Sequence, residues 1–416
     1  MRKMNRREFM KTTVAAGVGA TLTTGPAFLK YALGETPVKY GCILPLSGVM
    51  AELSADQKIA SEISIEEINK NGGILGRQVE LIIRDSEGTA PTARRKAEEL
   101  CEREKVDFLG GTCTGWEELA ISEVSKRNKK NFFVYPQNFL DNTIKDSFNE
   151  LAFDLNVSPY YAAASLGKWV AENLPGKKWH LLADNYSWPR MWMPAYKKWA
   201  KKTGKEWTGE TWAPFPCKDY STYIPQVLAK RPDVLFTITW GSGQISQIKQ
   251  FAEFGMADKM PCIFGVTDIP WAHAAGKGAF KGLYAGMPWY WELQTEYPKA
   301  KSFNDRFFAN CKRMPAAYGQ VTYEGPILYR DIVNKIKSMD PFKVAKALEG
   351  LKFQGLKSDV YIRACDHLAI QEFYMAKGKA EKDMAGDFDF FNLVGSGGVS
   401  EELAKTCKEK GLDNRV

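Results

Sequence analysis

Short apolar runs and longer amphipathic segments alternate along the chain from Val38 onward. This alternation is typical of a parallel β-sheet covered by helices. The apolar runs predict a first group of strands at 38–44, 79–84, 107–110 and 131–135. The helix predicted after Pro91 has small and apolar residues on one stripe and Arg and Glu on the other, so we expect it to lie on the sheet with one face in water.

The same pattern then restarts and predicts five more strands, at 179–183, 205–212, 234–239, 262–265 and 283–287. Helices return over 299–339, and two extended segments follow at 353–362 and 369–376. Two successive α/β units predict two lobes, with several chain crossings and a ligand cleft between them.

The alternation also predicts where the lobes divide. We expect residues 35–153 and 289–354 to form the first lobe, and residues 154–288 and 355–378 to form the second. Residues 379–416 are predicted to be a loosely packed extension that ends in a short helix.

The first 34 residues have the features of a targeting segment. Arg6-Arg7 is followed by Phe9 and Lys11, which resembles the twin-arginine export motif, and an apolar run from Thr12 to Leu29 comes next. Residues 1–34 are therefore predicted to be a twin-arginine signal peptide that is cleaved before Glu35. No later segment has about 18 consecutive apolar residues, so the mature chain is expected to be soluble and periplasmic.

Charge and composition exclude several functions. The chain has a formal net charge of +8, but most of this excess lies in the first 34 residues. The remainder has nearly balanced acidic and basic residues, which argues against a nucleic-acid partner. Only three histidines are present, and the sequence has no Walker motif, nucleophile elbow or Cys/His metal cluster. We expect no enzyme activity, no metal and no cofactor.

All eight cysteines lie beyond residue 34, and an exported protein can form disulfides. We predict one disulfide, between Cys365 and Cys407, that ties the extension to the late strand. The other cysteines are expected to have a structural or inert role.

Several motifs resemble one known family. Leu44-Pro45-Leu46-Ser47-Gly48 closes the first strand, and residues 66–77, Glu-Glu-Ile-Asn-Lys-Asn-Gly-Gly-Ile-Leu-Gly-Arg, end the first helix. Further elements at 110–115, 183–188 and 362–367 follow in the same order and spacing. The chain resembles the type I periplasmic solute-binding proteins of the leucine/isoleucine/valine, amide and urea branch, which deliver ligands to ABC transporters.

This resemblance implies the fold and the partners. The expected fold is α/β, with two Rossmann-like lobes that have parallel sheets and are joined by a multi-stranded hinge. The lobes would close over a small ligand without chemistry, and the closed form would be recognised by a membrane permease. We expect a monomer.

The resemblance also implies ligand anchors in the first lobe, at Ser47, Thr112 and Thr114. These residues lie where a strand ends and a helix begins, a place where free backbone N–H groups bind anions. Their hydroxyls could equally serve only as helix caps. Cys113, which lies between Thr112 and Thr114, is predicted to contact the ligand with them. It stands where leucine-binding relatives have a cysteine, but its usual partner is missing here, so that family disulfide is not expected.

The second lobe is expected to cover the ligand with aromatic side chains, first of all Tyr186 and Trp188. Further tryptophans lie near predicted strand ends, at positions 240, 271, 289 and 291. Asp268 falls near the place where leucine-binding relatives hold the ammonium group of the ligand. Two alternatives remain open, because Thr267 takes this position if the alignment shifts by one residue, and Asp268 could also be a solvated loop residue.

The expected ligand is a branched-chain amino acid or a related small molecule. Urea, a short amide or an aromatic acid are the alternatives within the same fold, and Pro189-Arg190 is closer to the urea and amide relatives. A periplasmic sensory receptor is the alternative from another functional class, and a hydrolase ranks last.

Overall fold

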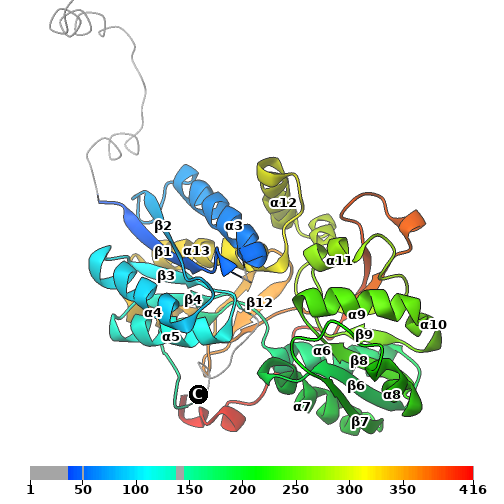
Figure 1. The fold of residues 1–416 in the computed structure, drawn as a ribbon. Helices are drawn as coiled ribbons and strands as arrows, with labels where there is room; N and C mark the ends of the chain where they lie inside the picture. Colours follow the sequence, from blue (N-terminus) through cyan, green and yellow to red (C-terminus); the bar gives the residue numbers. More distant parts are fainter. Residues whose placement is uncertain (1–35, 49–50, 137–144, 416) are drawn as a thin grey trace, which may run out of the picture.

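The structure of this protein, a computed structural model, describes residues 36–48, 51–136 and 145–415. Two α/β lobes lie side by side, the first in blue and cyan and the second in green (Figure 1). The two lobes confirm the predicted fold class. The predicted signal peptide lies outside the described residues.

The first lobe is built on a five-stranded parallel sheet in the order β2-β1-β3-β4-β5. Its strands are β1 (Val38–Leu44), β2 (Val79–Asp85), β3 (Phe108–Gly111), β4 (Asn131–Val134) and β5 (Ala152–Asp154). Helices α4 (Ala90–Glu98) and α5 (Gly115–Arg127) pack on one face, and α3 (Ala51–Lys70), α13 (Ala317–Ile336) and α14 (Pro341–Leu348) pack on the other. Successive strand residues serve opposite faces, so Tyr40 and Cys42 pack with α13 whereas Ile43 packs with α4.

The glycine turn after α3 has the structural role that its sequence indicates. Gly73 has a φ of 73°, and its N–H donates to the carbonyl of Ile68 at 2.8 Å, which closes the end of the helix. A Cβ on Gly73 would lie 1.9 Å from the carbonyl oxygen of Arg77. Only glycine therefore fits at this position.

The second lobe has a seven-stranded sheet in the order β15-β14-β10-β9-β8-β6-β7. Five parallel strands, β6 (Lys178–Asp184), β7 (Glu206–Ala213), β8 (Val234–Ile238), β9 (Cys262–Phe264) and β10 (Tyr284–Met287), agree closely with the prediction. Antiparallel strands β14 (Tyr374–Gly378) and β15 (Phe391–Ser396) complete the sheet. Helices α6 (Pro159–Asn173) and α7 (Ser187–Lys202) cover one face, and α8 (Tyr223–Ala229), α9 (Gly241–Glu253), α10 (Met256–Lys259) and α11 (Ile269–Ala275) cover the other.

A small third sheet joins the two lobes. It contains β11 (Lys352–Gln354), β12 (Asp359–Ile362) and β13 (Ala369–Ile370), all antiparallel. The chain crosses between the lobes after β5, after β10 and after β13, and α12 (Pro298–Cys311) follows the second crossing and packs on α3. The two extended segments predicted here contain four short strands in the structure: these three strands and β14 (Tyr374–Gly378), which belongs to the sheet of the second lobe.

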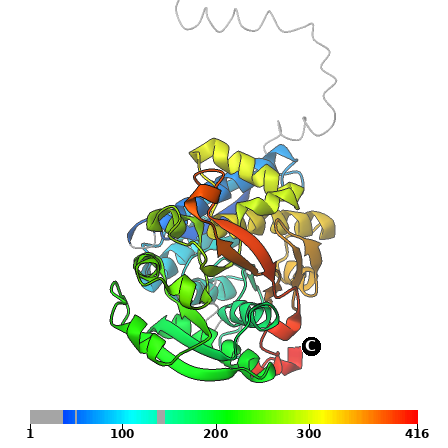
Figure 2. The same ribbon diagram turned by 90° about the vertical axis from the view of Figure 1, so that its right-hand side faces the viewer.

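The C-terminal segment is more closely integrated than we predicted. Its strand β15 pairs with β14 at the edge of the second sheet, and Figure 2 shows the red C-terminal end at the right-hand side of the second lobe. The expectation of a loosely packed extension is therefore wrong for this strand. The predicted disulfide between Cys365 and Cys407 is confirmed, and beside it the buried Asp366 pairs with Arg363 and Lys410.

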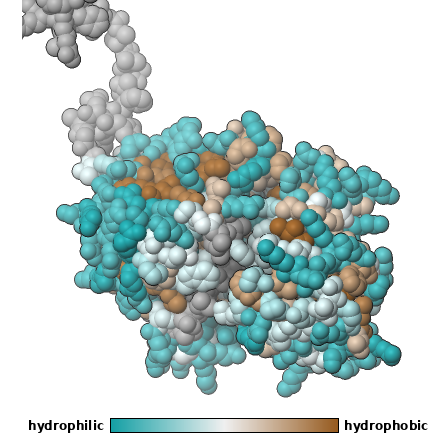
Figure 3. All heavy atoms as spheres, in the orientation of Figure 1, coloured by the Kyte–Doolittle hydropathy of each residue, from teal (hydrophilic) through white to brown (hydrophobic). Residues whose placement is uncertain are grey.

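Hydrophilic residues dominate the face shown in Figure 3, and hydrophobic residues form only separate patches on it. Among the described helices, none combines the length and the apolar character needed to span a bilayer.

Candidate ligand-binding site

A small cavity of about 20 Å³ lies between the lobes. The second lobe contributes residues from loops and from the first turns of α7 and α11, and the first lobe contributes the start of α13, which packs along α3. The lining residues are Asn156, Trp188, Trp240, Val266, Asp268, Trp271, Pro288, Ala317 and Tyr318. This volume holds little more than a water molecule, so the lobes must separate to admit an amino acid.

Asp268 is the acidic residue of the cavity. It is the N-cap of α11, where its Oδ1 accepts the N–H of Ile269 at 2.8 Å. Its Oδ2 accepts the N–H of Ala317 at 2.9 Å, and this hydrogen bond connects the two lobes. Burial raises the pKa of Asp268 to about 7. Within the described part of the chain, no Lys, Arg or His forms a salt bridge with this carboxylate.

The carboxylate of Asp56 lies nearby and has a different environment. Its Oδ2 accepts the N–H of Ala316 at 2.8 Å, and its Oδ1 pairs with Arg313. Asp56 and Asp268 therefore both bind the first turn of α13, one from each lobe, where the helix dipole favours negative charge. Asp56 pairs directly with Arg313, whereas the hydrogen bonds to Asp268 come from backbone N–H groups and Arg313 acts on it only through its charge.

Aromatic side chains form much of the cavity wall. Trp240 and Trp271 meet edge to face with their ring centroids 5.7 Å apart, and Trp188 packs edge to face on Trp192 at 5.4 Å. Tyr318 completes the set from the first lobe. Trp188 and Asp268, both predicted from the sequence, thus meet in one cavity.

Three other predicted aromatics lie elsewhere. Tyr186 does not line the cavity, but it stacks on Phe215 with ring centroids 4.2 Å apart and on the cavity residue Trp188 at 6.3 Å. The indole N–H groups of Trp289 and Trp291 donate to the carbonyls of Pro315 and Phe388. Both tryptophans therefore have a structural role outside the cavity.

The predicted anchors Thr112 and Thr114 surround a carboxylate that sequence reasoning missed. Their hydroxyls donate to Oε2 of Glu117 at 2.8 and 2.5 Å, and the hydroxyl of Ser86 donates to Oε1. Glu117 is fully buried in the first turn of α5. The signal was present in the sequence, since Thr114 and Glu117 have the spacing of a capping box.

Ser47 and Cys113 also lie outside the lining of the cavity. Ser47 is exposed and hydrogen-bonds to Asp85; burial raises the pKa of Asp85, but hydrogen bonds from Glu87, Ser47 and Leu46 lower it more. Cys113 is a buried free thiol, as expected from the missing partner, and burial raises its pKa.

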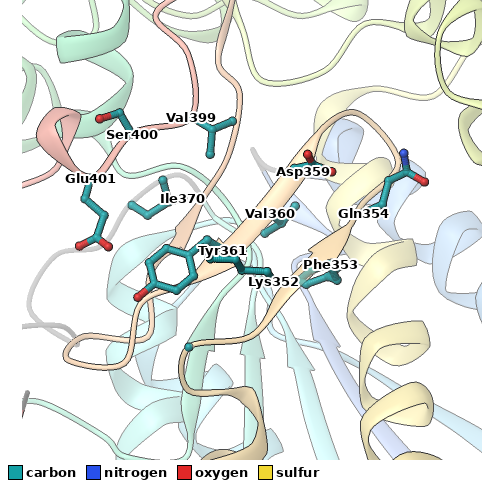
Figure 4. Close-up of a pocket in the computed structure, with 11 residues that line it drawn as sticks. Lys352, Phe353, Gln354, Asp359, Val360, Tyr361, Ile370, Val399, Ser400 and Glu401 are labelled. Carbon is teal, nitrogen blue, oxygen red and sulfur yellow. The ribbon is translucent and has the colours of Figure 1, made fainter.

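A larger groove of about 880 Å³ lies between the hinge sheet and the C-terminal segment. Figure 4 shows Tyr361 and Val360 of β12 on one side and Val399, Ser400 and Glu401 on the other. This groove shares no lining residue with the interlobe cavity and contains none of the predicted site residues. The described residues contain no cluster of His, Cys, Asp and Glu that could hold a metal ion.

Two lobes, a hinge and a cavity between the lobes define a ligand-binding protein of the periplasmic type. The family model of the periplasmic binding proteins matches residues 37–383, and the chain belongs to this family. The predicted family is thereby confirmed.

Curated relatives and solved structures agree with this assignment. The chain is 22% identical over 339 residues to the Leu/Ile/Val-binding protein homolog 7 of Brucella abortus, covering 77% of this chain and 83% of that protein. It is also 22% identical to the leucine-, isoleucine-, valine-, threonine- and alanine-binding protein of Pseudomonas aeruginosa, covering 79% of this chain and 86% of that protein.

The fold matches that of an amino acid ABC transporter substrate-binding protein from Pseudomonas fluorescens, with a TM-score of 0.83, 22% identity and coverage of 91% of this chain and 99% of that one. A solute-binding protein from Rhodopseudomonas palustris in complex with benzoate matches with a TM-score of 0.73 and 19% identity, covering 88% of this chain and 97% of that one.

Proposed function

We propose that this protein is the periplasmic ligand-binding component of an ABC transporter, for branched-chain amino acids or related small ligands. It binds without chemistry and presents its closed form, as a monomer, to a membrane permease. The relatives named for leucine, isoleucine and valine support this function. The observation that carries it is the interlobe cavity, which the hydrogen bond from Ala317 to Asp268 closes.

The proposed division of labour follows the predicted domains. Residues 35–153 and 289–354 would move as the first lobe, residues 154–288 and 355–378 as the second, and residues 379–416 would follow the second through β15. In this proposal Trp188 and Asp268 contact the ligand. Ligand contact by Ser47, Thr112, Cys113, Thr114 and Tyr186 stays a prediction from the sequence.

Aromatic acids are the second candidate ligands, because tryptophans line the cavity and the R. palustris structure holds benzoate. An aromatic carboxylate would, however, have to approach Asp268, which has no cationic partner among the described residues. The aromatic wall of the cavity therefore favours aromatic acids as ligands, whereas the carboxylate of Asp268 disfavours them.

A ligand screen tests the function. The melting temperature of the mature protein is measured with branched-chain amino acids, amides, urea and aromatic acids. Ligands that raise it are confirmed by calorimetry. A ligand that binds only the folded state stabilises it by about 2.7 kcal/mol at a hundredfold excess over Kd. Saturable 1:1 binding supports the proposal, and a protein that binds no small molecule contradicts it.

Export is tested separately. We propose that Arg6-Arg7 directs the chain to the twin-arginine pathway. Replacing both arginines with lysine should leave the precursor in the cytoplasm, as seen by cell fractionation. Normal periplasmic accumulation of the double variant would show that another route is used.

A further inference from the structure

The interlobe cavity combines one buried carboxylate, that of Asp268, with four aromatic side chains. Asp268 is only 4% exposed and has no ion-pair partner in the described chain. A buried carboxylate without a counter-charge is costly unless something positive reaches it. The nine lining residues include neither Lys nor Arg, so the cavity itself supplies no formal positive charge.

The carboxylate retains capacity to bind. Two carboxylate oxygens offer about four lone-pair directions, and the hydrogen bonds described for Asp268 are those from the N–H groups of Ile269 and Ala317. One of these two donors belongs to the other lobe. When the lobes separate, Oδ2 loses this donor and becomes accessible to a ligand.

Among the other polar side chains of the lining, Asn156 already makes two hydrogen bonds. The amide of Asn156 donates to the carbonyl of Tyr135 at 3.0 Å and accepts the N–H of Val157 at 2.9 Å. A primary ammonium carries three N–H donors that each need an acceptor, and Asp268 is the only carboxylate among the lining residues. A cation whose nitrogen carries alkyl groups has no such requirement and binds well against indole rings.

We propose that the cavity binds the alkylated ammonium group of a quaternary or N-methylated amine, with Asp268 as counter-charge and Trp188, Trp240, Trp271 and Tyr318 as its aromatic cage. This assignment rests on the proposed function and narrows its ligand class. The second lobe supplies the carboxylate and the tryptophans, and the first lobe closes the cage with Tyr318.

Choline and its neutral carbon analogue 3,3-dimethylbutan-1-ol form a matched pair of probes, since they differ essentially in charge. We expect calorimetry to show saturable binding of choline, with affinity for the neutral analogue at least tenfold weaker. Tetramethylammonium should compete with choline, because it carries the same cationic group without the alcohol.

Variants of the cage then test the geometry. Asp268→Asn keeps the shape of the side chain and should weaken choline binding at least tenfold. Trp240→Leu should weaken it severalfold, whereas Trp240→Phe should retain part of the affinity. Asp184→Asn is the control, because Asp184 is a buried acid of the same lobe that does not line the cavity. Each variant is first checked for a cooperative melting transition.

The outcomes separate the two proposals. Binding of leucine, urea or benzoate without any response to choline and tetramethylammonium overturns the cage and leaves the proposed function standing. Equal affinity for choline and its neutral analogue, or unchanged choline affinity in both Asp268→Asn and Trp240→Leu, also overturns the cage. A protein that binds neither these compounds nor any other compound of the ligand screen overturns both proposals.

Discussion

Glu117 in the first lobe and Asp268 in the second are both buried carboxylates at the start of a helix, but their partners differ. Three hydroxyls donate to Glu117, whereas Asp268 receives two backbone N–H groups and otherwise borders aromatic rings. The first carboxylate is saturated by its own lobe. The second depends on the other lobe for one of its donors, which makes it the carboxylate that an opening motion exposes to a ligand.

The largest expected effect concerns the saturated carboxylate. Glu117→Leu keeps a similar volume but leaves three buried hydroxyls without their acceptor, so we expect the free energy of unfolding to fall by about 3 kcal/mol. Urea unfolding measures this change. Glu123→Leu is the matched control on the exposed side of the same helix and should change stability by less than about 0.5 kcal/mol. Similar losses in the two variants would contradict a structural role for Glu117.

The second prediction uses the pH dependence of Asp268. Burial raises its pKa in the folded state to about 7, above the unfolded value of about 3.9. The folded state therefore holds the proton more tightly. The resulting stability is fully present below about pH 4 and is lost as the pH rises to about 7, by on the order of 1 kcal/mol per pH unit. Above pH 7 the curve should flatten.

The control for this titration is Asp268→Asn, which removes the proton that is released. The neighbouring Asp56 and Arg313 remain in the variant, and so does Asp184, whose pKa burial raises to about 6. The difference between the two unfolding curves, measured from pH 5 to 8, therefore isolates Asp268. A difference that does not change with pH would show that Asp268 titrates normally.

The third prediction asks whether the first-lobe hydroxyls bind ligand. The hydroxyl of Thr114 donates to Glu117, so we expect Thr114→Val to cost about 1 kcal/mol of unfolding free energy. The same variant should change the Kd of the best ligand by less than about twofold. A tenfold weaker Kd, about 1.4 kcal/mol, would instead confirm the ligand anchor that the family resemblance implies.

Most strands could be predicted from the sequence, because buried parallel strands are short apolar runs between amphipathic helices. The two omissions have physical reasons. Strand β5 has only three residues, too few for a periodic pattern. Strand β15 ends in the glycine- and serine-rich segment 395–398, which reads as a loop, and pairs only because tertiary contacts place it beside β14.

The candidate site was predictable in part. Trp188 and Asp268 follow strand ends, which is where ligands bind in α/β proteins. Ala317 and Tyr318 come from a helix that is distant in sequence, and only the packing of α13 on the first lobe brings them to Asp268. No local pattern could identify these two residues, because their role depends on the meeting of the lobes.

The smallest expected effect concerns Tyr186, an aromatic residue of the second lobe that lies beside the cavity without lining it. Its ring stacks on Phe215 and on Trp188 but does not itself line the cavity, so Tyr186→Phe should leave ligand affinity unchanged within about twofold. Trp188→Phe changes a ring that lines the cavity and should weaken binding by about 0.5–1 kcal/mol, severalfold in Kd. The Kd of each variant is measured from the quenching of tryptophan fluorescence by the ligand, at equal protein concentration. Equal losses in the two variants would mean that Tyr186 reaches the ligand when the lobes close and belongs to the same aromatic cover as Trp188.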